Sequence, residues 1–193
     1  MVYREWEDDR LIELAKANNR QAFDEIVRRY QDGLQRYAAR MLRGDQVLAA
    51  ELTVEAFVRL WERRKAFKTC EKLGGWLYRT THRLVLDTLS SATTTGVLDE
   101  DLVGEQIVWK IVEQRSQAAA AQEAVSQLSV PLRAVFILSV YEEMSYEEIA
   151  AILEVSIGTV KSRIVRGRDA LRKILASRLE QQSVRQLVPR AAK

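Results

Sequence analysis

The stretch SYEEIAAILEVSIGTVKSRIVRGRDALRK, residues 145–173, decides how this chain is interpreted. It contains two short helical patterns joined by a tight turn. Ser145 precedes two glutamates and is a suitable N-cap for a first helix with the apolar set Ile149, Ala150, Ile152 and Leu153. A second helix is predicted from about Thr159, with the apolar set Val160, Ile164, Val165 and Leu171. Two helices joined in this way are typical of a helix-turn-helix.

Charge divides the same stretch into two parts. Residues 142–154 contain five acidic and no basic side chains, whereas residues 155–173 contain six basic and one acidic. The basic second helix suits the negative potential of a DNA major groove, and we expect the acidic segment to face away from phosphate. Small residues, Gly158, Thr159 and Ser162, favour close approach to DNA. The competing interpretation is a solvated helical hairpin with ordinary surface charges.

Composition indicates a globular helical protein. The 193 residues are 47% hydrophobic and 30% charged, with 2 prolines and 8 glycines, which predicts an all-α chain of one large or two small domains. No apolar run approaches the ~20 residues of a membrane span, and the first ten residues lack the apolar core of a secretory signal. Cys70 and His82 are the only residues of their types, so we expect no internal disulfide, no zinc site and a reducing cytoplasm. The chain lacks phosphate-binding glycine loops and catalytic constellations, which predicts no enzyme activity, cofactor or metal.

The distribution of charge suggests domain boundaries. Residues 1–90 carry 17 basic and 14 acidic side chains, residues 91–117 are acidic, and residues 178–193 carry 4 basic and 1 acidic. We predict an N-terminal helical domain (1–90), an acidic linker (91–117), a helix-turn-helix domain (118–177) and a frayed basic tail (178–193).

The C-terminal motifs resemble a known family. The segments VPLRAVFILSVYEEMS, VSIGTV and KSRIVRGRDAL are similar to region 4 of the sigma-70-type transcription initiation factors, most closely the extracytoplasmic-function (ECF) branch. Where that branch usually has RAR, this chain has Gly167 between two arginines, a change that costs on the order of 1 kcal/mol of helix propensity relative to alanine and would loosen the helix. The resemblance implies contacts to a promoter −35 element from Ser156, Thr159, Lys161, Ser162, Arg163, Arg166 and Arg168.

The segment AAELTVEAFVRLW, residues 49–61, resembles region 2.2 of the same family. That resemblance implies docking on the β′ clamp helices of core RNA polymerase, with region 4 meeting the β flap. The implied docking residues are Glu51, Leu52, Glu55, Phe57 and Trp61. The spacing of four residues places Glu51 and Glu55 on one helix face. An ordinary solvated acidic face would show the same spacing, so this alternative to polymerase docking stays open.

The loop 65–75 and the following WLYRTTHRLVLD resemble the part of region 2 that captures and melts the −10 element. The implied residues are Lys68, Lys72, Trp76, Tyr78, Arg79 and Arg83. The usual arginine run after Asp87 is replaced by small polar residues, 90–95, which we expect to begin the flexible linker. Serine and threonine cannot neutralise phosphates, so weaker −10 engagement is predicted.

Together these observations predict an all-α protein with two small helical domains, region 2-like and region 4-like, joined by an acidic linker. The resemblance covers about residues 8–176 and implies an ECF-type sigma factor that binds core RNA polymerase and promoter DNA, without membrane insertion. An anti-sigma factor is a further partner that the family implies. Two alternatives stay open: a sigma-like protein that sequesters an anti-sigma factor, and a stand-alone helix-turn-helix regulator.

Overall fold

The computed structural model describes residues 3–68, 72–94 and 121–187. Most of the predicted linker, the middle of the 65–75 loop with Cys70, and the end of the tail lie outside these residues. Within the described part every regular element is helical. None of these helices is long and apolar enough to cross a bilayer.

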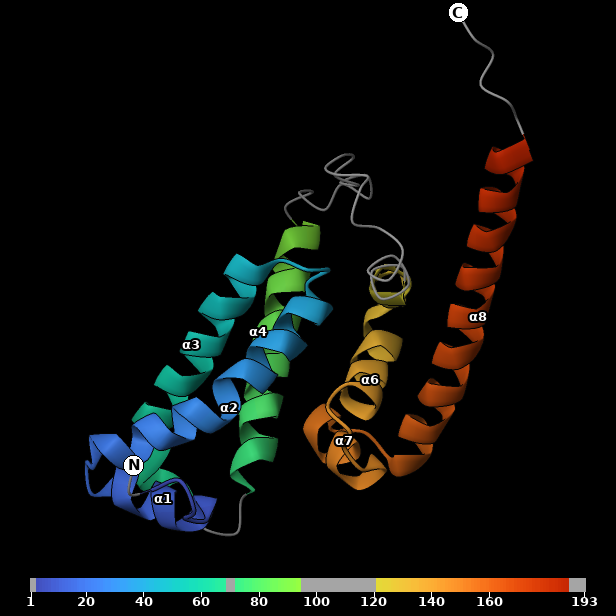
Figure 1. Ribbon diagram of the computed structural model, residues 1–193. Coiled ribbons are helices and arrows are strands. Elements are labelled where there is room, and N and C mark those ends of the chain that lie inside the picture. The colour runs from blue at the N-terminus through green and yellow to red at the C-terminus, as the bar shows by residue number, and fades with distance from the viewer. Residues whose placement is uncertain (1–2, 69–71, 95–120, 188–193) are drawn as a thin grey trace, which may run out of the picture.

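Two groups of helices make up the fold (Figure 1). In the N-terminal group, α2 and α3 pack along each other and against α4, and α1 packs on α2 at one end. In the C-terminal group, α6, α7 and the long α8 pack together. Their bounds are α1 Asp8–Lys16, α2 Arg20–Met41, α3 Gln46–Arg63, the short 3₁₀ helix η1 Arg64–Ala66, α4 Leu73–Thr94, α6 Val130–Val140, α7 Tyr146–Leu153 and α8 Ile157–Leu187.

Local sequence sets where the first helices begin. The Asn19 side chain accepts a hydrogen bond from the Ala22 backbone N–H at 3.1 Å and caps α2. The Asp45 side chain does the same for α3, with the Leu48 N–H at 3.0 Å. Gly44, with φ of +100°, supplies the left-handed turn between them. These caps explain why the helix positions predicted for residues 8–64 are confirmed.

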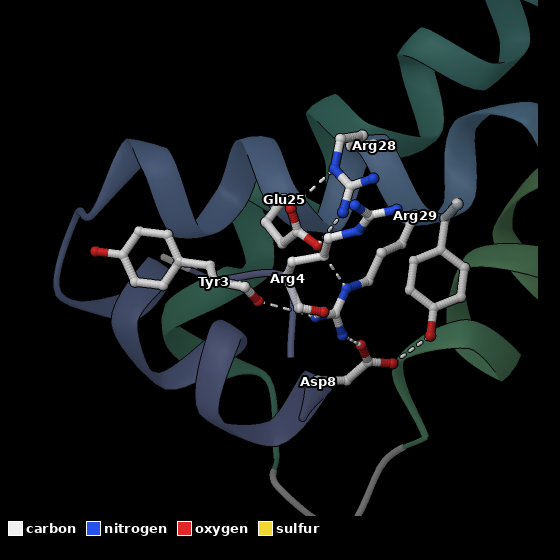
Figure 2. Close-up of polar contacts among 7 residues, drawn as sticks. Tyr3, Arg4, Asp8, Glu25, Arg28 and Arg29 are labelled. Carbon is white, nitrogen blue, oxygen red and sulfur yellow. Dashed lines mark hydrogen bonds and ion pairs between the residues drawn. The ribbon is translucent and has the colours of Figure 1, made fainter. Parts of the chain in front are cut away.

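The N-terminal segment is fixed onto α2 by one arginine (Figure 2). The Arg29 guanidinium donates to Asp8 Oδ1 at 2.9 Å and to the backbone carbonyls of Tyr3 and Arg4 at 3.0 and 3.1 Å. Its Nε donates to Glu25, whose pKa is lowered to about 2, chiefly by hydrogen bonding to Arg28 and also by Arg29. The network orders the chain ahead of α1.

The two groups of helices share one continuous core. Apolar residues of both, such as Leu34 and Tyr37 of α2 and Val135 and Ile149 of the C-terminal group, belong to a single cluster of buried side chains. α6 lies against α2, and α7 lies against α4. The helix-turn-helix is therefore docked on the N-terminal domain.

Three predicted boundaries are wrong, the first being the end of the loop predicted for residues 65–75, since α4 already begins at Leu73. α4 begins at Leu73 and runs to Thr94, so residues 90–94 are helical instead of opening the linker. The Ser90 and Ser91 hydroxyls donate to the Asp87 carbonyl at 2.8 Å, an arrangement that satisfies these polar side chains within a helix. Similarly, α8 continues through Leu187, so the predicted frayed tail is helical over its first residues.

Replacing Gly167 with alanine is expected to stabilise the protein by about 1 kcal/mol, because Gly167 lies inside α8 and alanine is the better helix former. A Cβ there would lie 3.9 Å from the Leu132 carbonyl oxygen, an ordinary van der Waals distance. At Gly33 of α2, in contrast, a Cβ would lie 2.6 Å from the Tyr78 hydroxyl. Urea denaturation should show Gly167→Ala stabilised and Gly33→Ala destabilised; a destabilised Gly167→Ala would contradict the packing described.

Candidate functional site

The helix-turn-helix is held by well-formed caps. Ser145 and Glu148 form a reciprocal capping box at the start of α7. Glu154, with φ of 55° and ψ of 45°, ends α7 in the left-handed region. Ser156 then accepts a hydrogen bond from the Thr159 N–H at 3.1 Å and contacts the Thr159 hydroxyl at 2.9 Å. Ser156 and Thr159, both predicted DNA contacts, are thus also the residues that begin α8.

The first half of α8 presents a basic face. Val160, Ile164 and Gly167 are buried, whereas the cations Lys161, Arg166 and Arg168 are exposed. Ser162 is half-buried, with its hydroxyl donating to the Thr159 carbonyl. Val165 of the predicted apolar set is 59% exposed and lies among these cations, a placement that periodicity alone did not show.

Arg163 is half-buried, unlike these exposed cations. Burial lowers the pKa of His82 of α4, and the charge of Arg163 adds to that effect. The structure therefore separates Arg163 from the exposed cations with which the sequence grouped it.

The residues predicted for the −10 element lie on or just before α4. Lys68, Lys72 and Arg83 are exposed, and Arg79 is half-buried. Trp76 is half-buried, with its ring centroid 6.0 Å from that of Phe67.

Tyr78, from the same predicted set, is only 6% exposed and lies between the domains. Its hydroxyl donates to Glu142 Oε2 at 2.8 Å, and burial together with that carboxylate raises the pKa of Tyr78. A cavity of about 560 Å³ opens beside it, lined by Tyr30, Trp76, Arg79, Met144, Glu148 and Ile152, among others.

α3 exposes a different set from the one predicted. Glu51 is exposed and Glu55 pairs with Arg59 at 2.8 Å, but Phe57 is 7% exposed and belongs to the core. Leu52 and Trp61 are half-buried, and the Trp61 ring packs on Phe23 at 4.9 Å.

Three valines occupy the outer face of α3 in place of Phe57. Val47, Val54 and Val58 are all exposed, Val54 by 62%. Their spacings of seven and four residues place them in one line along the helix, with Glu51 in the same line. The family resemblance led to the prediction of the aromatic residues as docking residues. The spacing of the three valines, at 47, 54 and 58, was the sequence pattern that could have indicated this exposed apolar face.

His82 of α4 is a further buried titratable group. Its Nδ1 lies 2.7 Å from the Tyr37 hydroxyl. Burial, with Arg163 adding to it, lowers the pKa of His82 to about 4, so the imidazole is neutral at neutral pH. Among residues 3–68, 72–94 and 121–187 no cluster of three or more His, Cys, Asp or Glu side chains is arranged to hold a metal.

Two helical domains, one with a basic helix-turn-helix and the other with an exposed helix face, define a DNA-binding protein with a second interaction surface. Family models match both: Sigma-70 region 2 over residues 26–95, and Sigma-70, region 4 over residues 118–171. The ECF RNA polymerase sigma factor SigW of Bacillus subtilis (strain 168) is 30% identical over 177 residues, covering 85% of this chain and 94% of that relative. SigE of Mycolicibacterium smegmatis is 36% identical over 161 residues, covering 80% of this chain and 62% of that relative.

Solved structures agree on the fold. CnrH, in complex with the cytosolic domain of CnrY, matches with a TM-score of 0.67 at 23% identity, over 88% of this chain and 97% of CnrH. The sigma factor RpoE of Bartonella quintana, in complex with the anti-sigma factor NepR, matches with a TM-score of 0.64 at 22% identity, over 80% of this chain and 96% of RpoE. The chain belongs to the ECF family of RNA polymerase sigma factors. It is a transcription initiation factor that binds core RNA polymerase and promoter DNA.

Proposed function

We propose that three separate surfaces divide the work of this sigma factor: α3 docks on polymerase, α4 engages the −10 element and α8 reads the −35 element. The observation that carries this division is the exposed line of Val47, Val54 and Val58 on α3. Apolar side chains aligned on a surface that the fold leaves uncovered favour a protein partner. Glu51 and Glu55 beside them supply charge for the β′ clamp helices.

On α8, Lys161, Arg166 and Arg168 are available to DNA in the arrangement described. Arginine can pair bidentately with a guanine edge, while lysine contacts phosphate without reading sequence. The capped start of α8 at Ser156 and Thr159 adds backbone N–H groups that favour a phosphate. Ser162 and Arg163, both half-buried, complete the proposed −35 set.

On the N-terminal domain, the proposed −10 contacts rest on Lys68, Lys72, Arg79 and Arg83, with Trp76 as the stacking group. Tyr78 of the same predicted set is buried between the domains and is not available for stacking in this arrangement. No cation follows Arg83 in the described part of α4. We expect the affinity for the −10 element to depend less steeply on salt concentration than it would with a continued arginine run. Each phosphate contact adds to the slope of the logarithm of the binding constant against the logarithm of the salt concentration.

The proposed boundaries follow the same division. The family matches and the course of α4 support a polymerase and −10 domain that extends through α4 to Thr94, followed by a linker up to residue 117. The second family match supports a −35 domain from residue 118, with the β flap as its polymerase contact and with α8 running to Leu187. Action in the cytoplasm without enzyme activity of its own fits such a factor. The complex of RpoE with the anti-sigma factor NepR supports an anti-sigma partner for this chain as well.

Replacing Val54 with aspartate is expected to weaken binding to core RNA polymerase roughly ten-fold or more, because it places a charge at the centre of the apolar line. Val140→Asp, at the exposed end of α6, is the matched control, with the same change at a similarly exposed valine. Affinity is measured by fluorescence anisotropy, and open-complex formation on a promoter library follows in the same samples.

Each outcome separates the candidate functions. Binding and opening by the parent protein with loss in Val54→Asp supports the division of surfaces. Equal binding by the two valine variants would remove α3 as the docking surface. A parent protein that binds polymerase without opening the promoter would point to the altered segment after Asp87 and to a required activator. A parent protein that binds no polymerase would favour the stand-alone regulator or the anti-sigma decoy.

A further inference from the structure

The cavity beside Tyr78 is large enough to hold a small molecule. Its volume of about 560 Å³ lies within the roughly 300–1,000 Å³ that is usual for ligand sites in proteins. The start of α4 lines one side of it, α7 lines the other, and α2 contributes Tyr30. Gly74 and Gly75 carry no side chains, so the cavity stays open at the first turn of α4. The polymerase and DNA contacts proposed above do not require such a cavity.

The walls of this cavity are mainly apolar and aromatic. Tyr30 and Trp76 provide two aromatic side chains, both half-buried. The Trp76 ring packs edge-on against Phe67, with 6.0 Å between the ring centroids. Met144 and Ile152 line the cavity from the C-terminal group of helices, and Ile152 is only 2% exposed. Aromatic and aliphatic walls of this kind favour a ligand with a flat aromatic part.

The polar part of the lining is positively charged. Three cations, Arg63, Lys72 and Arg79, line the cavity together with one carboxylate, that of Glu148. The Ser145 backbone N–H and hydroxyl donate to Glu148 Oε2 at 3.1 and 2.9 Å, so this carboxylate is already held by its capping box. Positive charge therefore exceeds negative charge in the lining by two, and a ligand that balances this excess is an anion.

Arg79 provides a donor that the protein leaves unused. Its Nε is buried, and among residues 3–68, 72–94 and 121–187 it has no hydrogen-bond partner. A buried N–H without an acceptor costs free energy, which a ligand oxygen would recover. A carboxylate is a suitable acceptor, because hydrogen bonds from a guanidinium to a carboxylate are charge-assisted.

A second hollow next to the cavity limits the length of an anionic ligand. It has a volume of about 430 Å³ and shares Lys72 and Glu148 with the first cavity. Its lining is acidic, with Glu7, Asp8 and Asp9. A long anion, such as a nucleic-acid strand or an acidic peptide, would meet these carboxylates beyond Lys72 and be repelled. The ligand that fits is therefore a small one.

We propose that this cavity is a binding site for a small aromatic carboxylate. The aromatic ring of the ligand lies among Tyr30, Trp76 and Ile152. Its carboxylate accepts a hydrogen bond from Arg79 Nε and is attracted by the charge of Lys72. The site is additional to the polymerase and DNA surfaces of the protein. Because its walls come from both groups of helices, a bound ligand stabilises the folded chain.

The test uses 1-naphthylacetate as the probe and 1-naphthylacetamide as its neutral counterpart of similar shape. Isothermal titration calorimetry measures the affinity of each probe for the full chain, and differential scanning calorimetry measures the melting temperature. We expect the carboxylate to bind at least about ten-fold tighter than the amide and to raise the melting temperature more. Neither measurement includes DNA or polymerase, so the result does not depend on the proposed roles of α3, α4 and α8.

Two variants separate the charge of the cavity from its shape. Arg79→Gln is expected to weaken binding of 1-naphthylacetate about ten-fold. Its control is Arg20→Gln, the same change at the exposed start of α2, outside the cavity. Ala151 is exposed on α7 and lines the cavity, so Ala151→Phe should fill the cavity and weaken both probes. Ala176→Phe, at an exposed position of α8, is the control for that change.

The outcomes distinguish an anion site from a nonspecific hollow. Equal affinity for the carboxylate and the amide, or equal affinity of Arg79→Gln and Arg20→Gln for the carboxylate, would overturn the anionic site. Unchanged binding in Ala151→Phe would show that the probe binds elsewhere and would overturn the assignment of this cavity. A parent protein that binds no 1-naphthylacetate at millimolar concentration would overturn the whole proposal. The melting temperature of each variant without ligand shows that it is folded.

Discussion

Replacing Arg133 with alanine is expected to lower the free energy of unfolding by roughly 2–4 kcal/mol. Arg133 is only 2% exposed, although it carries a charge. Its guanidinium donates to the Met41 carbonyl at 2.6 Å, the Ser126 carbonyl at 2.5 Å and the Leu128 carbonyl at 2.8 Å. Removing it leaves these carbonyls without their donor in a place that water does not easily reach.

The position of the Met41 carbonyl strengthens this contact. Met41 is the last residue of α2, where the helix dipole favours a positive charge. Burial, with the charge of Arg43 adding to it, lowers the pKa of Arg133 to about 10, so the group is still protonated at neutral pH. One side chain of α6 therefore joins the end of α2 to the segment before α6.

Urea denaturation of the full chain, followed by circular dichroism, measures the effect. Arg20→Ala, at the exposed start of α2, is the control and should change stability by no more than about 0.5 kcal/mol. Arg133→Lys keeps the charge but loses the planar guanidinium, so its free energy of unfolding should lie between those of Arg133→Ala and Arg20→Ala. An Arg133→Ala protein as stable as the Arg20→Ala protein would show that the three carbonyls need no donor.

Acidification from pH 6.5 to pH 4 is expected to cost the protein about 3 kcal/mol of stability through His82 alone. The pKa of His82 is about 4 in the folded chain, below the ordinary 6.5. The unfolded chain therefore takes up the proton first, and the unfolding free energy falls as pH falls through this window. Above about pH 7.5 His82 is neutral in both states and its contribution is flat.

The matched variant is His82→Asn, whose amide can occupy the place of Nδ1 beside the Tyr37 hydroxyl without titrating. Carboxylates such as Glu154 titrate in both proteins, so the difference between them isolates the imidazole. At pH 5 the parent should have lost about 2 kcal/mol more than the variant, relative to pH 7.5. Parallel stability curves for the two proteins would mean that His82 is not held neutral by its site.

Much of the fold could be predicted from local sequence. Asn19, Asp45 and Ser145 each cap the helix that follows, and Pro131 lies in the first turn of α6. The family, the all-α fold and the pair of helical domains are confirmed. The boundaries that failed, at Leu73, at Ser90 and beyond residue 178, are places where glycine or polar residues were interpreted as loop or tail although they lie in helices.

The candidate site was only partly predictable. Its basic helix and acidic segment follow from composition, yet Phe57 proved to be core and Val54 surface. Resemblance identifies the helix that a family uses, but the exposed residues depend on which face its neighbours cover. The roles of the individual site residues stay predictions until the variants above are measured.

By itself the sequence determined most of the helical segments and the membership of the ECF sigma factors, because caps, periodicity and motifs act over a few residues. Only the tertiary structure decided that Glu142 and Glu154 lie against Tyr78 and Arg83, 64 and 71 residues earlier in the chain. Charge patterns show that acidic and basic surfaces exist. Which of them meet depends on packing between residues far apart in the sequence, such as the contact of Arg133 with the end of α2.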